Sequence, residues 1–267
     1  MPAYASSLLG VWAAGALLQA YATSALGPLV VGVVTGVGWY VWTASEGAAS
    51  VERPASSLLL AGALATALAV AHGADRRGRG LSGFAVPWRV AGGALLLVGL
   101  FLAALPQFGE LPDEGFDRWL WLGAAAVLVV ALVAGWSADR LGRLEVGGAI
   151  GLVLLGVLVL RWQPDGVRDL SQLSGEALAR VTLAVLVYLL AALGIAALGA
   201  VRGLDGLTHL ATAALVLFTV VQSFAIFQPI LSGATLFLAL GAVLAVSGFL
   251  VERGRRRLVD NVREVEA

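Results

Sequence analysis

The chain has 267 residues, of which 60% are hydrophobic and 13% are charged, and its mean hydropathy is +0.92. A soluble domain usually has about 45–50% apolar and about 25% charged residues, so this composition excludes a water-soluble globule, a disordered chain and a nucleic-acid-binding protein. Seventeen acidic residues balance seventeen Arg, and there is no Lys. The net charge of zero therefore indicates no particular partner. The sequence has no Cys, which excludes disulfides, thiolate metal sites and a Cys nucleophile.

Nine hydrophobic segments follow one another along the chain. A helix needs about 20 apolar residues to cross a hydrocarbon core about 30 Å thick, and lipid offers no hydrogen-bond partner to an open strand. We therefore predict an all-α integral membrane protein: a multi-pass bundle over residues 1–251, in the plasma membrane, with an Arg-rich cytoplasmic tail at 252–267. The nine predicted spans are 5–23, 28–44, 54–72, 90–108, 119–138, 145–162, 181–201, 209–228 and 230–251.

Two of these segments need a further argument. The first could be taken for a signal peptide, but no Arg precedes position 53 and a second span follows at once, so we interpret it as a retained helix. The sixth has only 15 apolar residues between Glu145 and Arg161. We expect it to span by extending its flanking side chains toward the membrane boundaries.

The orientation follows from counting Arg on alternate sides of the predicted spans. Twelve of the 17 Arg fall in the loops after the first, third, fifth and seventh spans and in the tail. Cytoplasmic loops carry the excess of basic residues in membrane proteins. The N-terminus is therefore predicted outside the cell and the C-terminus in the cytoplasm.

The cytoplasmic Arg residues concentrate in two places. They could contact anionic lipid headgroups or a cytoplasmic partner, because each base near an anionic leaflet contributes about 1 kcal/mol. Alternatively, they serve only to hold these segments inside. The predicted lipid- or partner-contact residues are Arg76, Arg77, Arg79 and Arg89 in the third loop, and Arg255, Arg256 and Arg257 in the tail.

None of the charged residues is expected well inside a predicted span. Charged groups at mid-bilayer usually mark proton relays or ion paths, so their absence argues against a proton-coupled transporter or pump. Gln19 and Gln222 are the most polar side chains within the spans. A buried amide needs a partner in lipid, and these two could either line a polar cavity for a small solute or make interhelical hydrogen bonds.

Two histidines, His72 and His209, are both predicted at the cytoplasmic boundary. They could meet at a bis-His haem or a shared metal, or they could be two separate interfacial imidazoles. We predict no cofactor. Small residues also recur at a spacing of four, which favours either an oligomer interface or ordinary packing within one bundle. These residues are Gly32 and Gly36, Ala61, Ala65 and Ala69, and Gly147 and Gly151.

The stretch from about 194 to 258 contains Gly199, Arg202, an apolar helix, the segment SFAIFQPILSGATLFLALGAVLAVSGFLVE and the tail RGRRRL. This pattern resembles the C-terminal part of a domain-of-unknown-function family of bacterial polytopic membrane proteins. In that family a penultimate helix leads through an aromatic-rich turn into a Gly-containing last helix and an Arg-rich tail. The resemblance covers about a quarter of the chain and implies an architecture, with no activity and no functional residue.

Three functions are compatible with this sequence. The first is a non-enzymatic scaffold or subunit of a membrane complex, whose cytoplasmic Arg loops contact lipid or other membrane subunits. The second is a transporter or channel for a small neutral or lipid-like solute. The third, an enzyme acting on a lipid, has only Asp113, Glu114 and His209 as candidates, so the sequence leans toward a protein that is not an enzyme.

Overall fold

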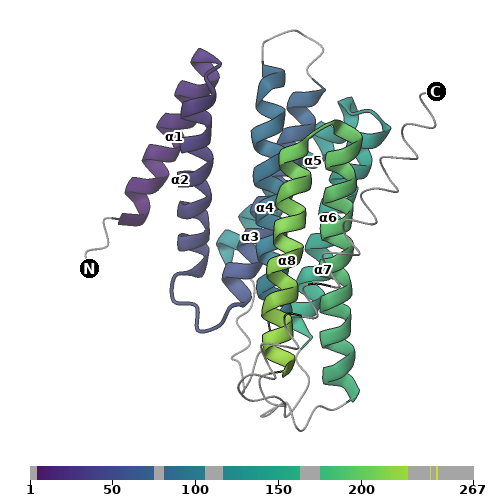
Figure 1. Cartoon of the computed structure of the whole chain (residues 1–267). Coiled ribbons are helices and arrows are strands. Elements are labelled where there is room, and N and C mark those ends of the chain that lie inside the picture. The colour runs from purple at the N-terminus through teal and green to yellow at the C-terminus, as the bar shows by residue number, and fades with distance from the viewer. Residues whose placement is uncertain are drawn as a thin grey trace, which may run out of the picture. The chain divides into compact units, whose positions relative to one another are not determined.

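The computed structural model describes residues 5–74, 81–105, 117–162 and 175–227, with two isolated positions at 241 and 245. This part of the chain is all-α, as the sequence predicts, and the chain divides into two units, residues 1–211 and 212–267. The helices, labelled in Figure 1, are α1 (Ala5–Thr23), α2 (Leu26–Ser45), α3 (Glu52–Gly73), α4 (Ala85–Ala104), α5 (Arg118–Ser137), α6 (Arg140–Arg161), α7 (Gly175–Arg202) and α8 (Asp205–Phe227), with a short 3-10 helix at Leu81–Phe84.

Seven of the described helices, α2 to α8, are long and apolar enough to cross a membrane, and α1 has a shorter apolar stretch, Ser7–Thr23. The predicted ninth span, 230–251, and the predicted tail, 252–267, lie outside the described residues. These lengths are compatible with an integral membrane protein.

The predicted starts of the fourth and sixth spans were wrong by five residues, and that of the seventh by six. Each prediction began at or after the last charged residue, whereas α4 begins at Ala85 and continues through Arg89, and α6 begins at Arg140 and continues through Glu145. The start of α6 is fixed by Asp139, whose Oδ1 accepts a hydrogen bond of 2.7 Å from the backbone N–H of Gly142. A side chain that caps a helix in this way stabilises its first turn, and no hydrophobicity pattern records it.

Helix α3 lies at the centre of the first unit. It packs against α2, α4, α5 and α6, and 72% of its apolar window is buried. Its closest neighbour is α4. A Cβ atom added to Gly62 would lie 2.8 Å from the backbone nitrogen of Leu96, and one added to Gly92 would lie 2.9 Å from the backbone nitrogen of Thr66. Glycine is therefore required where these two backbones touch.

The small residues selected from the sequence divide into two groups. A Cβ atom on Gly32 of α2 would lie 2.8 Å from the side chain of Leu17 on α1, so this glycine serves ordinary packing within the chain. Added Cβ atoms on Gly147 and Gly151 of α6 would meet nothing within 4 Å. Packing within the described residues therefore accounts for Gly32 but not for these two.

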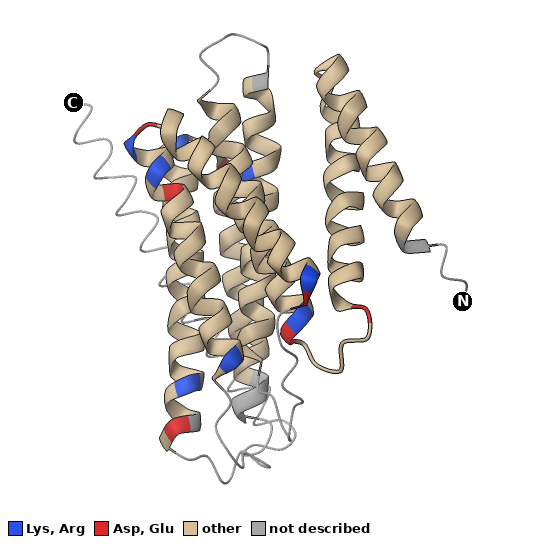
Figure 2. Ribbon diagram, turned by 180° about the vertical axis from the view of Figure 1, so that it is seen from behind, with Lys and Arg blue, Asp and Glu red and all other residues tan. Residues whose placement is uncertain are grey.

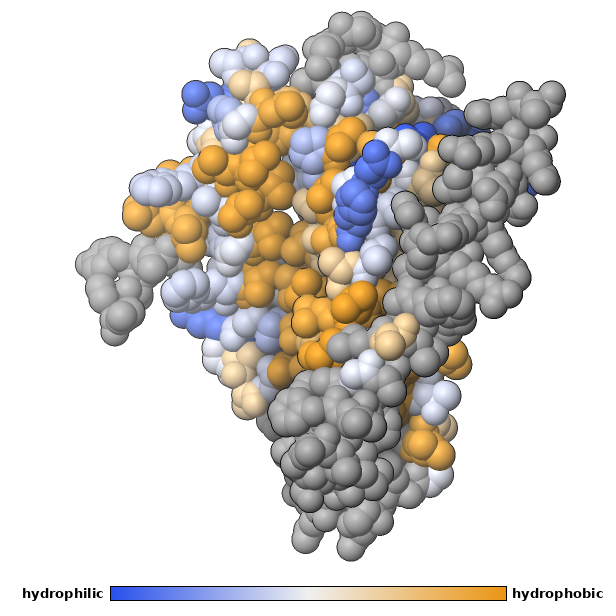
Figure 3. Space-filling view, viewed as in Figure 1, coloured by the Kyte–Doolittle hydropathy of each residue, from blue (hydrophilic) through white to orange (hydrophobic). Residues whose placement is uncertain are grey.

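The surface of the described helices is strongly apolar. Trp136 is 94% exposed and Leu132 is 75% exposed, both on α5. Hydrophobic residues gather in a broad area on the face shown in Figure 3. The charged residues lie near the helix ends, and the middle turns carry none (Figure 2). This is the distribution expected when lipid rather than water surrounds the helices.

Candidate functional site

Three charged side chains from α4, α6 and α7 meet at one end of the first unit. The Nε of Arg89 donates a hydrogen bond of 2.8 Å to Oε2 of Glu145. The Nε of Arg202 donates one of 2.8 Å to Oε1 of Glu145, and its Nη2 bonds to the same oxygen. We call this group the charged triad. The side chains of Arg89 and Glu145 are buried, at only 8% and 1% exposed, and that of Arg202 is 26% exposed.

The charged triad lies at the edges of the predicted spans, but inside the observed helices. Arg89 is the fifth residue of α4 and Glu145 the sixth residue of α6. Each lies more than one turn inside its helix. A buried ion pair persists only when its charges are matched and hydrogen-bonded. The matching here comes from three helices that are far apart in the sequence.

A second set of charged side chains lies at the opposite ends of α6 and α7, near the start of α3. The Nε of Arg161, at the end of α6, is 2.7 Å from Oε1 of Glu52, at the start of α3. The Nε of Arg180, near the start of α7, donates a hydrogen bond of 3.1 Å to the carbonyl of Val159. The charged triad joins the starts of α4 and α6 to the end of α7, and the second set joins the end of α6 to the starts of α3 and α7. Helices α3 and α7 therefore run in one direction, and α4 and α6 run in the opposite direction.

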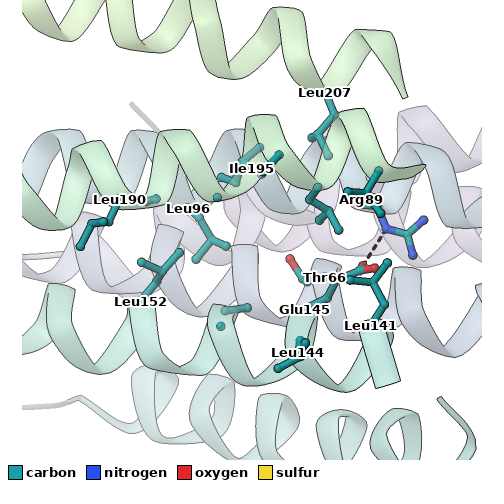
Figure 4. Close-up of a pocket in the computed structure, with 18 residues that line it drawn as sticks. Thr66, Arg89, Leu96, Leu141, Leu144, Glu145, Leu152, Leu190, Ile195 and Leu207 are labelled. Atoms are coloured by element: carbon teal, nitrogen blue, oxygen red, sulfur yellow. Dashed lines mark hydrogen bonds and ion pairs between the residues drawn. The ribbon is translucent and has the colours of Figure 1, made fainter. Parts of the chain in front are cut away.

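A cavity of about 420 Å³ adjoins the charged triad. It lies between α4, α6 and α7, and the start of α8 borders it through Leu207. Figure 4 shows Arg89 and Glu145 at one end and Leu190 and Leu152 at the other. Its lining is apolar apart from Thr66 and two members of the charged triad, and its main side chains are Leu96, Leu144, Leu152, Leu190, Ile195 and Leu207.

Glycines create the space in this cavity. Gly148 of α6 and Gly194 of α7 both line it, and a Cβ atom added to either would meet no described residue within 4 Å. Leu144 and Leu190 also line it and are 64% and 66% exposed. The cavity therefore opens sideways between α6 and α7, toward the apolar surface of the molecule.

The length of this cavity can be compared with a bilayer. Its lining on α7 runs from Val201 to Leu190, which corresponds to roughly 16 Å at about 1.5 Å per residue. Half of a hydrocarbon core is about 15 Å thick. The cavity thus has the depth of one leaflet, with a charged group at its boundary end and leucines at its inner end.

A second cavity, of about 580 Å³, lies between α1, α2, α3 and α5 and is lined almost wholly by apolar residues. Tyr21 lies at one end, where its hydroxyl is 3.0 Å from Nε2 of His72. Trp39 and Trp119 lie at the other end, with their rings 5.7 Å apart and nearly perpendicular. This cavity has no charged lining residue among those described.

The structure places the other predicted residues as follows. Arg89 is buried in the charged triad rather than lying in a loop. Gln19 is exposed on α1, and Gln222 belongs to the second unit. Neither glutamine is among the residues that line the two described cavities. The predicted Arg contacts outside the described residues are Arg76, Arg77, Arg79, Arg255, Arg256 and Arg257.

The two histidines occupy different environments. His72 has its Nε2 at the Tyr21 hydroxyl and its Nδ1 at 2.6 Å from the carbonyl of Leu68, so both ring nitrogens are engaged within the protein. His209 is exposed on α8. Within the described ranges, no group of three or more His, Cys, Asp or Glu side chains could hold a metal ion.

Sequence reasoning missed Glu145 and Arg202 as site residues, although a signal for them existed. Both lie on the predicted cytoplasmic side, as Arg89 does, and opposite charges at one membrane boundary can pair.

Comparison of the chain with protein-family models, with curated proteins and with solved structures finds no match. The function is therefore argued from the geometry of the site.

Proposed function

We propose that the chain is a multi-pass protein of the plasma membrane with nine transmembrane helices, its N-terminus outside and its C-terminus in the cytoplasm. The exposed leucines and tryptophans of the described helices support burial in lipid. The ion pairs of α6 with α4 and α7 at one end and with α3 at the other support the alternation on which the Arg count rests. With this orientation, the charged triad lies at the cytoplasmic boundary.

Within that membrane, the protein binds a lipid-like amphiphile in the cavity between α4, α6 and α7. The observation that carries this proposal is the combination of an apolar cavity one leaflet deep, a lateral opening and a buried charged group at the boundary end. A volume of about 420 Å³ falls in the range of about 300–1,000 Å³ that is usual for small-molecule sites. An amphiphile entering from the adjacent leaflet would keep its chain in lipid-like surroundings throughout.

Within the transport hypothesis, this proposal favours a lipid-like solute over a small neutral one. The cavity spans one leaflet rather than the full membrane, and neither Gln19 nor Gln222 lines it. The scaffold hypothesis rests mainly on Arg residues outside the described ranges, and it stays a prediction from the sequence.

Filling the cavity tests the proposal. Gly194→Trp places an indole in the open space of the cavity, whereas Gly135→Trp adds the same side chain to α5, where an added Cβ also meets nothing within 4 Å. Both variants would be purified in mild detergent, and their bound lipid would be quantified by mass spectrometry. Gly194→Trp is expected to lose most of a lipid that wild type and Gly135→Trp retain. Equal retention in all three proteins would contradict the proposal.

A further inference from the structure

We propose that the charged triad binds the anionic headgroup of the lipid whose chain occupies the adjacent cavity, through the guanidinium groups of Arg89 and Arg202. This inference rests on the proposed function and names the class of ligand: an amphiphile with a phosphate or carboxylate head.

The charge of the triad is positive. Two guanidinium groups share the single carboxylate of Glu145. Among the described residues, Asp139 also approaches the triad, at 3.7 Å from Nη2 of Arg202, but its side chain is 64% exposed and its Oδ1 already accepts the N–H of Gly142. Solvent screens that exposed charge. The three side chains of the triad, two buried and one 26% exposed, therefore sum to one positive charge, which attracts an anion and repels a cation.

The triad also has donors to offer. Each guanidinium has five N–H groups in a planar fork that matches a phosphate or carboxylate. Among the described residues, the hydrogen bonds to Glu145 use the Nε of Arg89 and the Nε and Nη2 of Arg202. Figure 4 shows the terminal nitrogens of Arg89 pointing away from Glu145. One of them, Nη2, lies near Gly73: a Cβ atom added to that glycine would be 3.7 Å from this nitrogen.

The triad lies at the end of the cavity where a lipid headgroup would be placed, and the lipid chain would lie along the rest of the cavity. Arg89 and Glu145 line the boundary end of the cavity, and from there leucines line it toward Leu152 and Leu190. A lipid seated with its chain along α7 would bring its headgroup to Arg89, and beside it to Arg202, which is bonded to Glu145 but does not itself line the cavity. No polar atom of the lipid would then be buried among the leucines. A purely apolar molecule would leave the excess positive charge unmatched, which is costly at low dielectric.

The test compares lipids that differ only in their heads. Wild-type protein in nanodiscs of zwitterionic lipid would receive photoactivatable lipids with identical chains and a phosphate, a phosphocholine or a neutral hydroxyl head. We expect the phosphate-headed probe to crosslink to α6 or α7 roughly tenfold more than the others, which is the factor that one charge-assisted hydrogen bond can supply. Arg202→Gln should remove this preference while crosslinking of the neutral probe persists, and Arg202→Lys should keep part of it.

Controls separate the possible failures. Arg140→Gln removes an exposed Arg from the start of α6 that does not line the cavity, and it should leave the preference unchanged. If all three probes crosslink equally in wild type, the headgroup inference is wrong while the proposed cavity function stands. If none crosslinks at α6 or α7, both fail. If inorganic phosphate at the same concentration as the probe abolishes crosslinking, the site takes the free anion, and the assignment to a lipid headgroup is overturned.

Discussion

The buried carboxylate of Glu145 should be the most sensitive charged position in the described structure. Glu145→Ala would leave the Arg89 side chain, only 8% exposed, without the acceptor 2.8 Å from its Nε. Removing one partner of a buried pair costs about 3–5 kcal/mol, because the remaining charge stays desolvated. Arg202 adds less to this loss because its side chain is 26% exposed and water can solvate it.

The assay is equilibrium unfolding of the purified protein in mixed detergent micelles. Glu145→Ala should lower the free energy of unfolding by about 3 kcal/mol or more, whereas Glu46→Ala, at an exposed position after α2, should change it by less than about 0.5 kcal/mol. The double variant Arg89→Met with Glu145→Met replaces both charges by apolar side chains. It should be more stable than Glu145→Met alone, since no buried charge is left unpaired. The reasoning would be refuted if Glu145→Ala behaved like Glu46→Ala, or if the two Met substitutions were simply additive.

Three further substitutions test the packing and the local contacts. Gly92→Val should destabilise the protein by about 1–3 kcal/mol because the added side chain would clash with the backbone of α3. Gly135→Val should have no such effect. Equal unfolding midpoints for the two variants would contradict the close contact of α3 and α4. Tyr21→Phe removes the hydrogen bond to His72 and should cost about 0.5–1.5 kcal/mol, so an unchanged unfolding curve would exclude that bond. Asp139→Ala removes the cap of α6 and should lower the free energy of unfolding by about 1 kcal/mol. Circular dichroism should detect a loss of helix, and an unchanged helix content would contradict the role of Asp139 as a cap.

The sequence predicted the middle of each described helix because hydrophobic length alone decides what can cross lipid. The bounds of α1, α2, α3 and α5 lie within about two residues of the predicted spans. The starts of α4 and α6 could not be predicted in the same way. Arg89 lies inside α4, where its charge is paired with Glu145, a residue 56 positions away in the sequence.

The cavity could not be predicted from the sequence either. Gly62 and Gly92 mark a close contact between two backbones, whereas Gly148 and Gly194 mark open space. All four are glycines in apolar helices, and nothing local distinguishes them. The difference arises from which helix lies opposite and at what distance, which only the folded arrangement specifies. The charge count did predict that Arg89, Glu145 and Arg202 share one side of the membrane, but not that they touch.

Cysteine labelling tests the central claim, that these helices cross a membrane in the proposed orientation. The chain has no Cys, so each introduced thiol is the single target of a membrane-impermeant maleimide. In intact cells, Glu46→Cys should react, and Asp205→Cys should react only after permeabilisation. Leu132→Cys, 75% exposed and more than one turn from the end of α5, should react only after denaturation. Rapid labelling of Leu132→Cys in the native protein would mean that water surrounds these helices. Labelling of Asp205→Cys from outside would reverse the orientation.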